Sequence, residues 1–265
     1  MARLLMLLAL CFAPVVAEET APLRIAAAAD LAKALEDLTA WHQAETRQPA
    51  TVTLGSSGLL ARQIAQGAPF DVFFSANAGF IDDLIAQGHG VASSRALYGR
   101  GRIVLWTKAE GILPPEGLAD LTDRRFTRIA IANPDHAPYG QAARQAMQQS
   151  GIWDAVHRRL VYGENVGQTL HYAQTGNAEV AVVALSLAIP TPGGTWTLID
   201  DRLHQPLDQG LMVVATSRQR QASEAFAARV TSPAGLAILR RYGFVQPGET
   251  LDPALLERAN GRLPR

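Results

Sequence analysis

Cysteine is nearly absent from this sequence, which has one, Cys11, in 265 residues. A single cysteine excludes a disulfide framework, a CxxC redox pair and a thiolate zinc site. Excess charge of one sign is also missing, because 24 Lys and Arg side chains balance 24 Asp and Glu. Without a broad basic surface we expect no nucleic-acid partner, and any charged ligand must be held by local geometry.

Recognisable catalytic motifs are missing as well. The sequence has no GxxxxGK[ST] loop and no dinucleotide fingerprint, and its six histidines form no HExxH or other close pair for a metal ion. The GSSG segment at 55–58 lacks the GxSxG spacing of a nucleophile elbow. We therefore expect no enzyme, no cofactor and no direct metal ligands. One enzymatic alternative stays open, a secreted serine hydrolase that uses Ser57 with a distant histidine.

The N-terminus has the three parts of a secretory signal peptide. Arg3 precedes an apolar run over 4–16, and Ala17 stands before two glutamates. The run is shorter than the roughly 20 apolar residues of a membrane-spanning helix. A lipoprotein signal would have a small residue before its cysteine, whereas Leu10 precedes Cys11. We predict that residues 1–17 are a signal peptide, cleaved after Ala17, and that an exported chain without cysteine remains.

The rest of the chain alternates short apolar runs with amphipathic helical patterns. This alternation predicts an α/β fold with mostly parallel sheets flanked by helices. Because some 248 residues exceed the usual size of one such unit, the length favours two lobes. Apolar runs predict buried strands at 23–29, 50–54, 71–74, 102–106, 128–132, 180–184 and 210–215.

Four of these predicted strands end in small or polar residues just before a helix. These ends are Asp30, the segment 55–58, the segment 75–77 and the loop 133–140. Ligands of open α/β sheets bind at the carboxyl ends of strands, and helix N-termini favour anions. Each such residue could instead serve only as a helix N-cap. Four similar ends together favour a shared anion site.

Several segments resemble the periplasmic molybdate-binding proteins of ABC importers, and the likeness spans about residues 23–247. The resemblance implies a two-lobed type II periplasmic binding protein fold with the ligand cleft between the lobes. One lobe would comprise 23–100 and 211–265, and the other 101–210. The matching segments are AAAADL at 26–31, SSGLLARQIAQGAP at 56–69, NPDHAPYG at 133–140, ENV at 164–166 and RYGF at 241–244.

The resemblance further implies a tetrahedral oxyanion, molybdate or tungstate, held as the whole anion by neutral donors. Those donors correspond here to Asp30, Ser57, the Ala76 N–H, Tyr139 and the Val166 N–H.

The sequence departs from this pattern at two positions. Ala184 stands where the family often has a tyrosine, whose hydroxyl Tyr139 could supply from the neighbouring loop. Asp30 places an acid where a neutral donor is expected, which costs several kcal/mol beside a buried dianion unless the acid is protonated, turned away or offset. Asp30 could alternatively be a pure N-cap, bonded to the N–H groups of residues 32 or 33.

These features predict a periplasmic solute-binding protein that captures molybdate or tungstate and delivers it to an ABC permease in the inner membrane. We expect a monomer. Two alternatives remain at this stage, a binding protein of the same fold for another small anion and the serine hydrolase.

Overall fold

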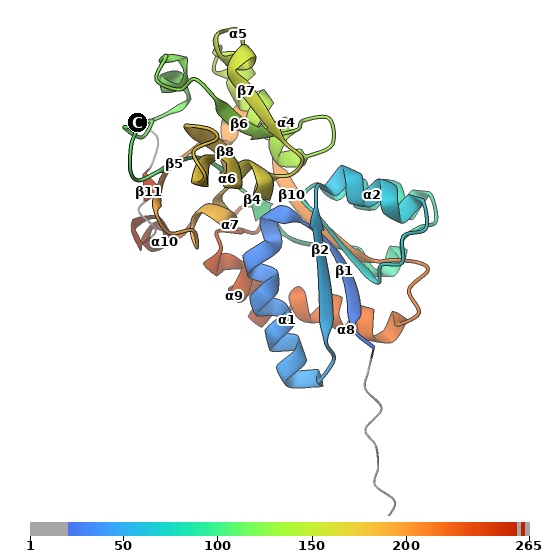
Figure 1. Cartoon of the computed structure of the whole chain (residues 1–265). Helices are drawn as coiled ribbons and strands as arrows, with labels where there is room; N and C mark the ends of the chain where they lie inside the picture. Colours follow the sequence, from blue (N-terminus) through green and yellow to red (C-terminus); the bar gives the residue numbers. More distant parts are fainter. Residues whose placement is uncertain (1–20, 259–260, 263–265) are drawn as a thin grey trace, which may run out of the picture.

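The chain folds into two lobes, each built on a β-sheet with helices packed against it (Figure 1). This computed structural model describes residues 21–258 and 261–262. The predicted signal peptide at 1–17 lies outside them. Among the helices that are described, none has the length and apolar character needed to cross a membrane.

The first lobe carries a five-stranded sheet within the described residues. Strand β1 pairs in parallel with β2 and β3, whereas β10 runs antiparallel to both β3 and β4. Across the sheet the order is β2 (Ala50–Gly55), β1 (Leu23–Ala28), β3 (Val72–Ser75), β10 (Leu207–Val213) and β4 (Ala96–Gly101).

The second lobe carries a six-stranded sheet within the same described part of the chain. Strand β6 pairs in parallel with β7 and β8, whereas β5 runs antiparallel to β8 and β9. The order is β11 (Gly261–Arg262), β9 (Gly194–Leu198), β5 (Ile103–Lys108), β8 (Val180–Ala184), β6 (Ile129–Ala132) and β7 (Leu160–Gly163). In each sheet one strand runs antiparallel to both of its neighbours, β10 in the first sheet and β5 in the second. The chain enters each sheet from the other lobe through that strand.

Helices cover both faces of the first sheet because each presents an apolar stripe to it. One apolar cluster packs α1 (Ala32–Thr46), α8 (Arg220–Val230) and α9 (Pro233–Arg241) on one face. A second cluster packs α2 (Ser57–Ala65) and α3 (Ala78–Ala86) on the other face. The short 3-10 helices of this lobe are η1 (Ala29–Leu31) and η2 (Ala92–Ser94).

The second lobe has its own core, which also takes in Ala28, Ala29 and Ala76 from the first lobe. The lobes therefore touch at the carboxyl ends of β1 and β3. Its helical segments are η3 (Leu118–Thr122), α4 (Pro138–Gln149), α5 (Trp153–Val156), η4 (His157–Arg159), α6 (Val166–Gln174), α7 (Leu185–Ala188), η5 (Asp201–Leu203) and α10 (Pro253–Arg258).

The chain crosses between the sheets at three places. Arg102 alone separates β4 from β5, and a segment containing η5 connects β9 to β10. Strand β11 then pairs with β9 in the second sheet. The expectation that all of 211–265 belongs to the first lobe is therefore wrong for its last strand, and β10 begins at Leu207, before the expected boundary at 210/211.

All seven predicted strands are present, but β2 is not buried as the sequence predicted. Residues 51–54 of β2 are exposed, with Leu54 44% accessible, because β2 is the edge strand of its sheet. Four strands were missed: β4, β7, β9 and β11. Strand β4 contains Gly99 and Gly101, and β7 lies half-exposed at a sheet edge, so neither forms a continuous apolar run.

Candidate functional site

A small cavity lies where the two lobes meet. All five residues predicted for the site line it: Asp30, Ser57, Ala76, Tyr139 and Val166. They come from the ends of β1, β2 and β3 in the first lobe and from the starts of α4 and α6 in the second. The strand ends that the sequence pointed to are thus gathered around one space. Their role in binding remains a prediction.

Ser57 begins α2 and is fully buried. Its Oγ accepts a hydrogen bond from the Ala76 N–H at 2.9 Å. The two expected donors therefore form a chain, because the Ala76 N–H polarises the Ser57 hydroxyl, which keeps its own proton to donate. The N-cap alternative for Ser57 is wrong, since Ser56 occupies that position. Asn77 does cap α3, with its side chain accepting from the Gly79 N–H.

Asp30 lies in η1 and is 1% exposed. Its Oδ2 accepts from Gln209 Nε2 at 2.7 Å and from the Tyr139 hydroxyl at 2.9 Å. The N-cap alternative for Asp30 is therefore wrong, because α1 begins at Ala32, after Leu31, with no side-chain cap. Burial raises the pKa of Asp30 from its ordinary value of 3.8 to about 7, and the hydrogen bonds from Gln209, Tyr139 and its own backbone only partly oppose this rise.

Gln209 is a central residue of the site that the sequence analysis missed. It is fully buried in β10, and besides Asp30 it donates to the Tyr139 hydroxyl at 2.9 Å. Its Oε1 accepts from the Tyr98 hydroxyl at 2.6 Å. A register shift between Gln209 and Gly210 interrupts the pairing of β10 with β4 at this point. Nothing in the local pattern distinguishes this glutamine from a polar loop residue, because only the fold brings its partners to it.

Tyr139 reaches the same cluster from the second lobe. Its hydroxyl donates to Asp30 Oδ2 at 2.9 Å. Ala184 is buried at the end of β8, and the prediction that Tyr139 supplies the hydroxyl missing there stays a prediction. Burial, followed by the charge of Asp30, raises the pKa of Tyr139 well above its usual range. Gly101 permits this approach, because a Cβ there would lie 2.2 Å from the Tyr139 hydroxyl.

Val166 is the first residue of α6, and Asn165 caps this helix. Asn165 Oδ1 accepts from the Gly167 and Gln168 N–H groups, both at 3.0 Å. The cap thus satisfies the next two amides, and Val166 itself lines the cavity.

Direct contacts between the lobes border the cavity. The Gly58 N–H donates to the His136 carbonyl at 3.0 Å, and Ser56 Oγ lies 2.8 Å from His136 Nδ1. Ser186 Oγ in α7 donates to the Asp30 carbonyl at 2.8 Å. The hydrolase alternative gains no support here, because His136 pairs with Ser56 while Ser57 accepts from a backbone amide.

The residues that line the cavity supply hydroxyl and backbone donors and include no Lys or Arg. Across the described part of the chain, no three His, Cys, Asp or Glu side chains are grouped as a metal site would require. The donors around the cavity therefore suit a small anion held by dipoles.

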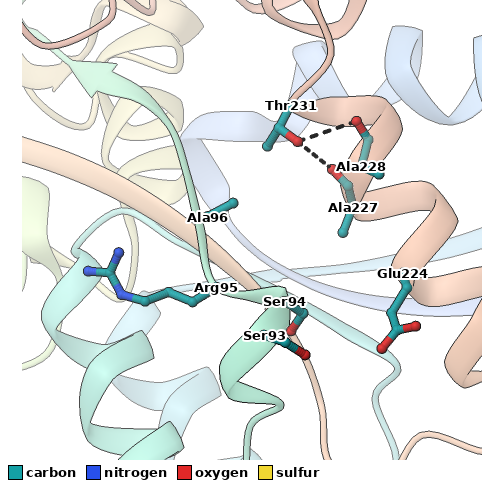
Figure 2. A pocket seen from close by; sticks show the side chains of 8 residues that line it. All are labelled: Ser93, Ser94, Arg95, Ala96, Glu224, Ala227, Ala228 and Thr231. Atoms are coloured by element: carbon teal, nitrogen blue, oxygen red, sulfur yellow. Dashed lines mark hydrogen bonds between the residues drawn. The ribbon is translucent and has the colours of Figure 1, made fainter.

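A larger hollow lies on the first lobe between η2 and α8 (Figure 2). Thr231 Oγ1 donates to the carbonyls of Ala227 and Ala228, and Arg95 extends away to pair with Asp82 at 3.0 Å. These polar groups already have partners within the protein. We therefore place the functional site at the smaller cavity, where buried polar atoms converge.

We expect Asp30→Asn to stabilise the protein at high pH. Because folding raises the pKa of Asp30 from 3.8 to about 7, the folded state holds the proton more tightly, and stability falls as pH rises through this window. The neutral amide removes this loss, by up to about 4 kcal/mol above pH 7. Thermal melts of both proteins at pH 4 and pH 8 measure the effect. An equal difference at both pH values would contradict a titrating Asp30.

Comparison with known proteins places this geometry in context. The model of a family described as bacterial extracellular solute-binding proteins matches residues 23–245. The chain is 34% identical to the molybdate-binding protein ModA of Rhodobacter capsulatus, over 83% of this chain and 86% of the relative. The solved structure of the periplasmic molybdate-binding protein of Azotobacter vinelandii matches with a TM-score of 0.80 at 30% identity, covering 85% of this chain and 99% of that chain.

A more distant match shows how widely the fold is used. The sulfate-binding protein SubI of Mycobacterium tuberculosis matches with a TM-score of 0.71, over 91% of this chain and 93% of that chain. At 14% identity this is a likeness of fold alone.

Proposed function

Because the chain belongs to the family of bacterial extracellular solute-binding proteins, we propose that it captures molybdate in the periplasm and delivers it to an ABC permease. It is a binding protein and not an enzyme. The relatives with 34% and 30% identity that support the ligand assignment are both molybdate-binding proteins. The observation that carries the proposal is the cavity between the lobes, lined by buried hydroxyl and amide groups without Lys or Arg.

The proposed mechanism is the replacement of hydration by fixed dipoles. Ser57 would donate its hydroxyl proton and Val166 its N–H to oxygens of the anion, while the Ala76 N–H strengthens the Ser57 hydroxyl from behind. Such donors stay in place without added charge, so the size of the cavity and the number of donors select the ligand. Tungstate, with the same shape and charge, should bind in the same way.

Binding would also hold the lobes together. Ser57 belongs to the first lobe and Val166 to the second, so an anion that bonds to both favours the arrangement in which the lobes touch. We propose that a monomer without a resident cofactor performs this capture and that the permease recognises the ligand-bound form.

Calorimetric titration with molybdate, tungstate, sulfate and phosphate tests the proposal. We expect tight binding of the first two anions, and about 10–100-fold weaker binding after Ser57→Ala, because one hydrogen bond to a charged group is lost. Ser223→Ala is the matched control, since Ser223 is equally buried but lies in α8, away from the cavity. A wild-type protein that gives no heat with molybdate or tungstate would refute this function.

A further inference from the structure

The Asp30 carboxyl group has one satisfied oxygen and one unsatisfied oxygen. Oδ2 accepts from Gln209 and Tyr139, whereas Oδ1 is buried and has no hydrogen-bond partner among the described residues. Asp30 also lines the cavity. A buried carboxylate oxygen without a donor is unfavourable, but a protonated oxygen in that place carries an O–H that can donate.

The charge of the surroundings favours the protonated form. No Lys or Arg lines the cavity, so no cation offsets a carboxylate that stands beside a dianion. An ionised Asp30 would therefore repel the proposed ligand from a buried position.

We infer, on the basis of the proposed function, that Asp30 binds the oxyanion as its neutral acid, with the proton on Oδ1 donated to a ligand oxygen. Oδ2 keeps its two donors, Gln209 and Tyr139. The proton comes from solvent, so whenever the free protein holds Asp30 ionised, molybdate dianion and one proton bind together. Asp30 is thus the residue that links affinity to pH.

The titratable groups around Asp30 do not account for a pH dependence near neutral pH, whereas Asp30 does. Burial raises its pKa to about 7, so it changes charge near neutral pH. The phenols that interact with it, Tyr139 from α4 and Tyr98 from β4, have pKa values raised by burial and then by Asp30 itself, so they stay neutral up to pH 9. From α7, Ser186 contributes only a hydroxyl to the Asp30 carbonyl.

The other neighbours carry no competing charge. The groups that shift the pKa of Asp30 include no Lys, Arg or His among the described residues. His136 contacts Ser56 at the border of the cavity, and burial lowers its pKa from 6.5, so it is neutral where Asp30 titrates.

The inference also bears on ligand choice. A fully deprotonated oxyanion such as molybdate accepts from every donor in the site, and the acid form of Asp30 adds one more. Hydrogen phosphate carries its own proton and needs an acceptor, which only ionised Asp30 would provide. The acid form of Asp30 therefore favours a fully deprotonated anion such as molybdate, whereas hydrogen phosphate would need the ionised form.

Titration of the wild-type protein with sodium molybdate from pH 6 to pH 9 tests the inference. With a free-state pKa of about 7, the rise in Kd should approach tenfold per pH unit above pH 7 and amount to about 50-fold between pH 7 and pH 9. Calorimetry at pH 8 in two buffers of different ionisation enthalpy should show uptake of about 0.9 proton per molybdate, and at pH 6 about 0.1.

Two variants assign the effect. Asp30→Asn keeps an acceptor for Gln209 and Tyr139 and offers an N–H in place of the acid proton, so it should bind tightly, without proton uptake and without the slope above pH 7. His136→Gln should retain the wild-type slope whatever its affinity.

Two results would overturn the inference. These are molybdate binding by the wild type at pH 8 without proton uptake, and a slope that persists in Asp30→Asn. Absence of molybdate binding at pH 6 would instead count against the proposed function, so the two failures are distinguishable.

Discussion

Gly58→Ala should weaken molybdate binding by about 100-fold while leaving both lobes folded. A Cβ at Gly58 would lie 2.7 Å from the His136 carbonyl oxygen, which belongs to the backbone of the other lobe. The lobes would have to separate, losing the hydrogen bond from the Gly58 N–H and the contact of Ser56 with His136. Two such bonds are worth about 2–3 kcal/mol, or roughly 100-fold in affinity.

The stability of the ligand-free variant separates this effect from misfolding. Gly58 lies in α2, where alanine is a better helix former than glycine by about 1 kcal/mol, so the melting temperature should fall by less than the loss of the two interlobe bonds alone would cause. Calorimetry with molybdate measures the affinity, and small-angle scattering measures whether the ligand still compacts the protein. Gly117→Ala is the control, because a Cβ there meets nothing within 4 Å. Wild-type affinity in Gly58→Ala would show that this contact does not limit binding.

Gln209→Leu should be destabilising by roughly 3 kcal/mol, because it removes three buried hydrogen bonds at about 1 kcal/mol each. Asp30 and Tyr139 would each lose one donor, and the Tyr98 hydroxyl would keep only its longer bond to the Ser75 carbonyl. The cluster joins α4 of the second lobe to β4 and β10 of the first, so its loss should also loosen the site. We expect weaker molybdate binding wherever the variant remains folded.

Denaturant unfolding followed by circular dichroism measures the effect of Gln209→Leu. Gln246→Leu is a suitable control, because Gln246 is only partly buried and donates a single side-chain bond, to the Tyr98 carbonyl at 3.0 Å. A loss in Gln209→Leu no larger than in this control would contradict a central role for Gln209.

The sequence predicted the site better than it predicted the contacts within the site. Asp30, Ser57 and Ala76 each follow a strand of one parallel set, so their meeting at one edge of the sheet follows from the period and order of the strands. The direction of each side chain does not follow from this. Asp30 turns to Gln209 and Tyr139, although a capping bond within its own helix was equally compatible with the sequence.

Errors in the fold prediction have the same origin. Apolar runs identified the buried strands such as β3 and β8, because a strand covered on both faces needs apolar side chains throughout. The edge strands β2 and β7 carry no such requirement, and β11 joins β9 only because α10 brings the chain end back to the second lobe.

The sequence by itself determined the α/β class, the two-lobed plan and the strand ends that meet at the site, since these depend on local periodicity and on residue types at strand and helix ends. It also determined that no broad surface charge would capture the anion, because its 24 basic and 24 acidic side chains balance. Only the tertiary structure decided the state of Asp30. One oxygen of its carboxyl group accepts from Gln209 and Tyr139, and the other is buried without a partner in the described part of the chain. Both depend on contacts between residues far apart in the chain, so no local pattern encodes them.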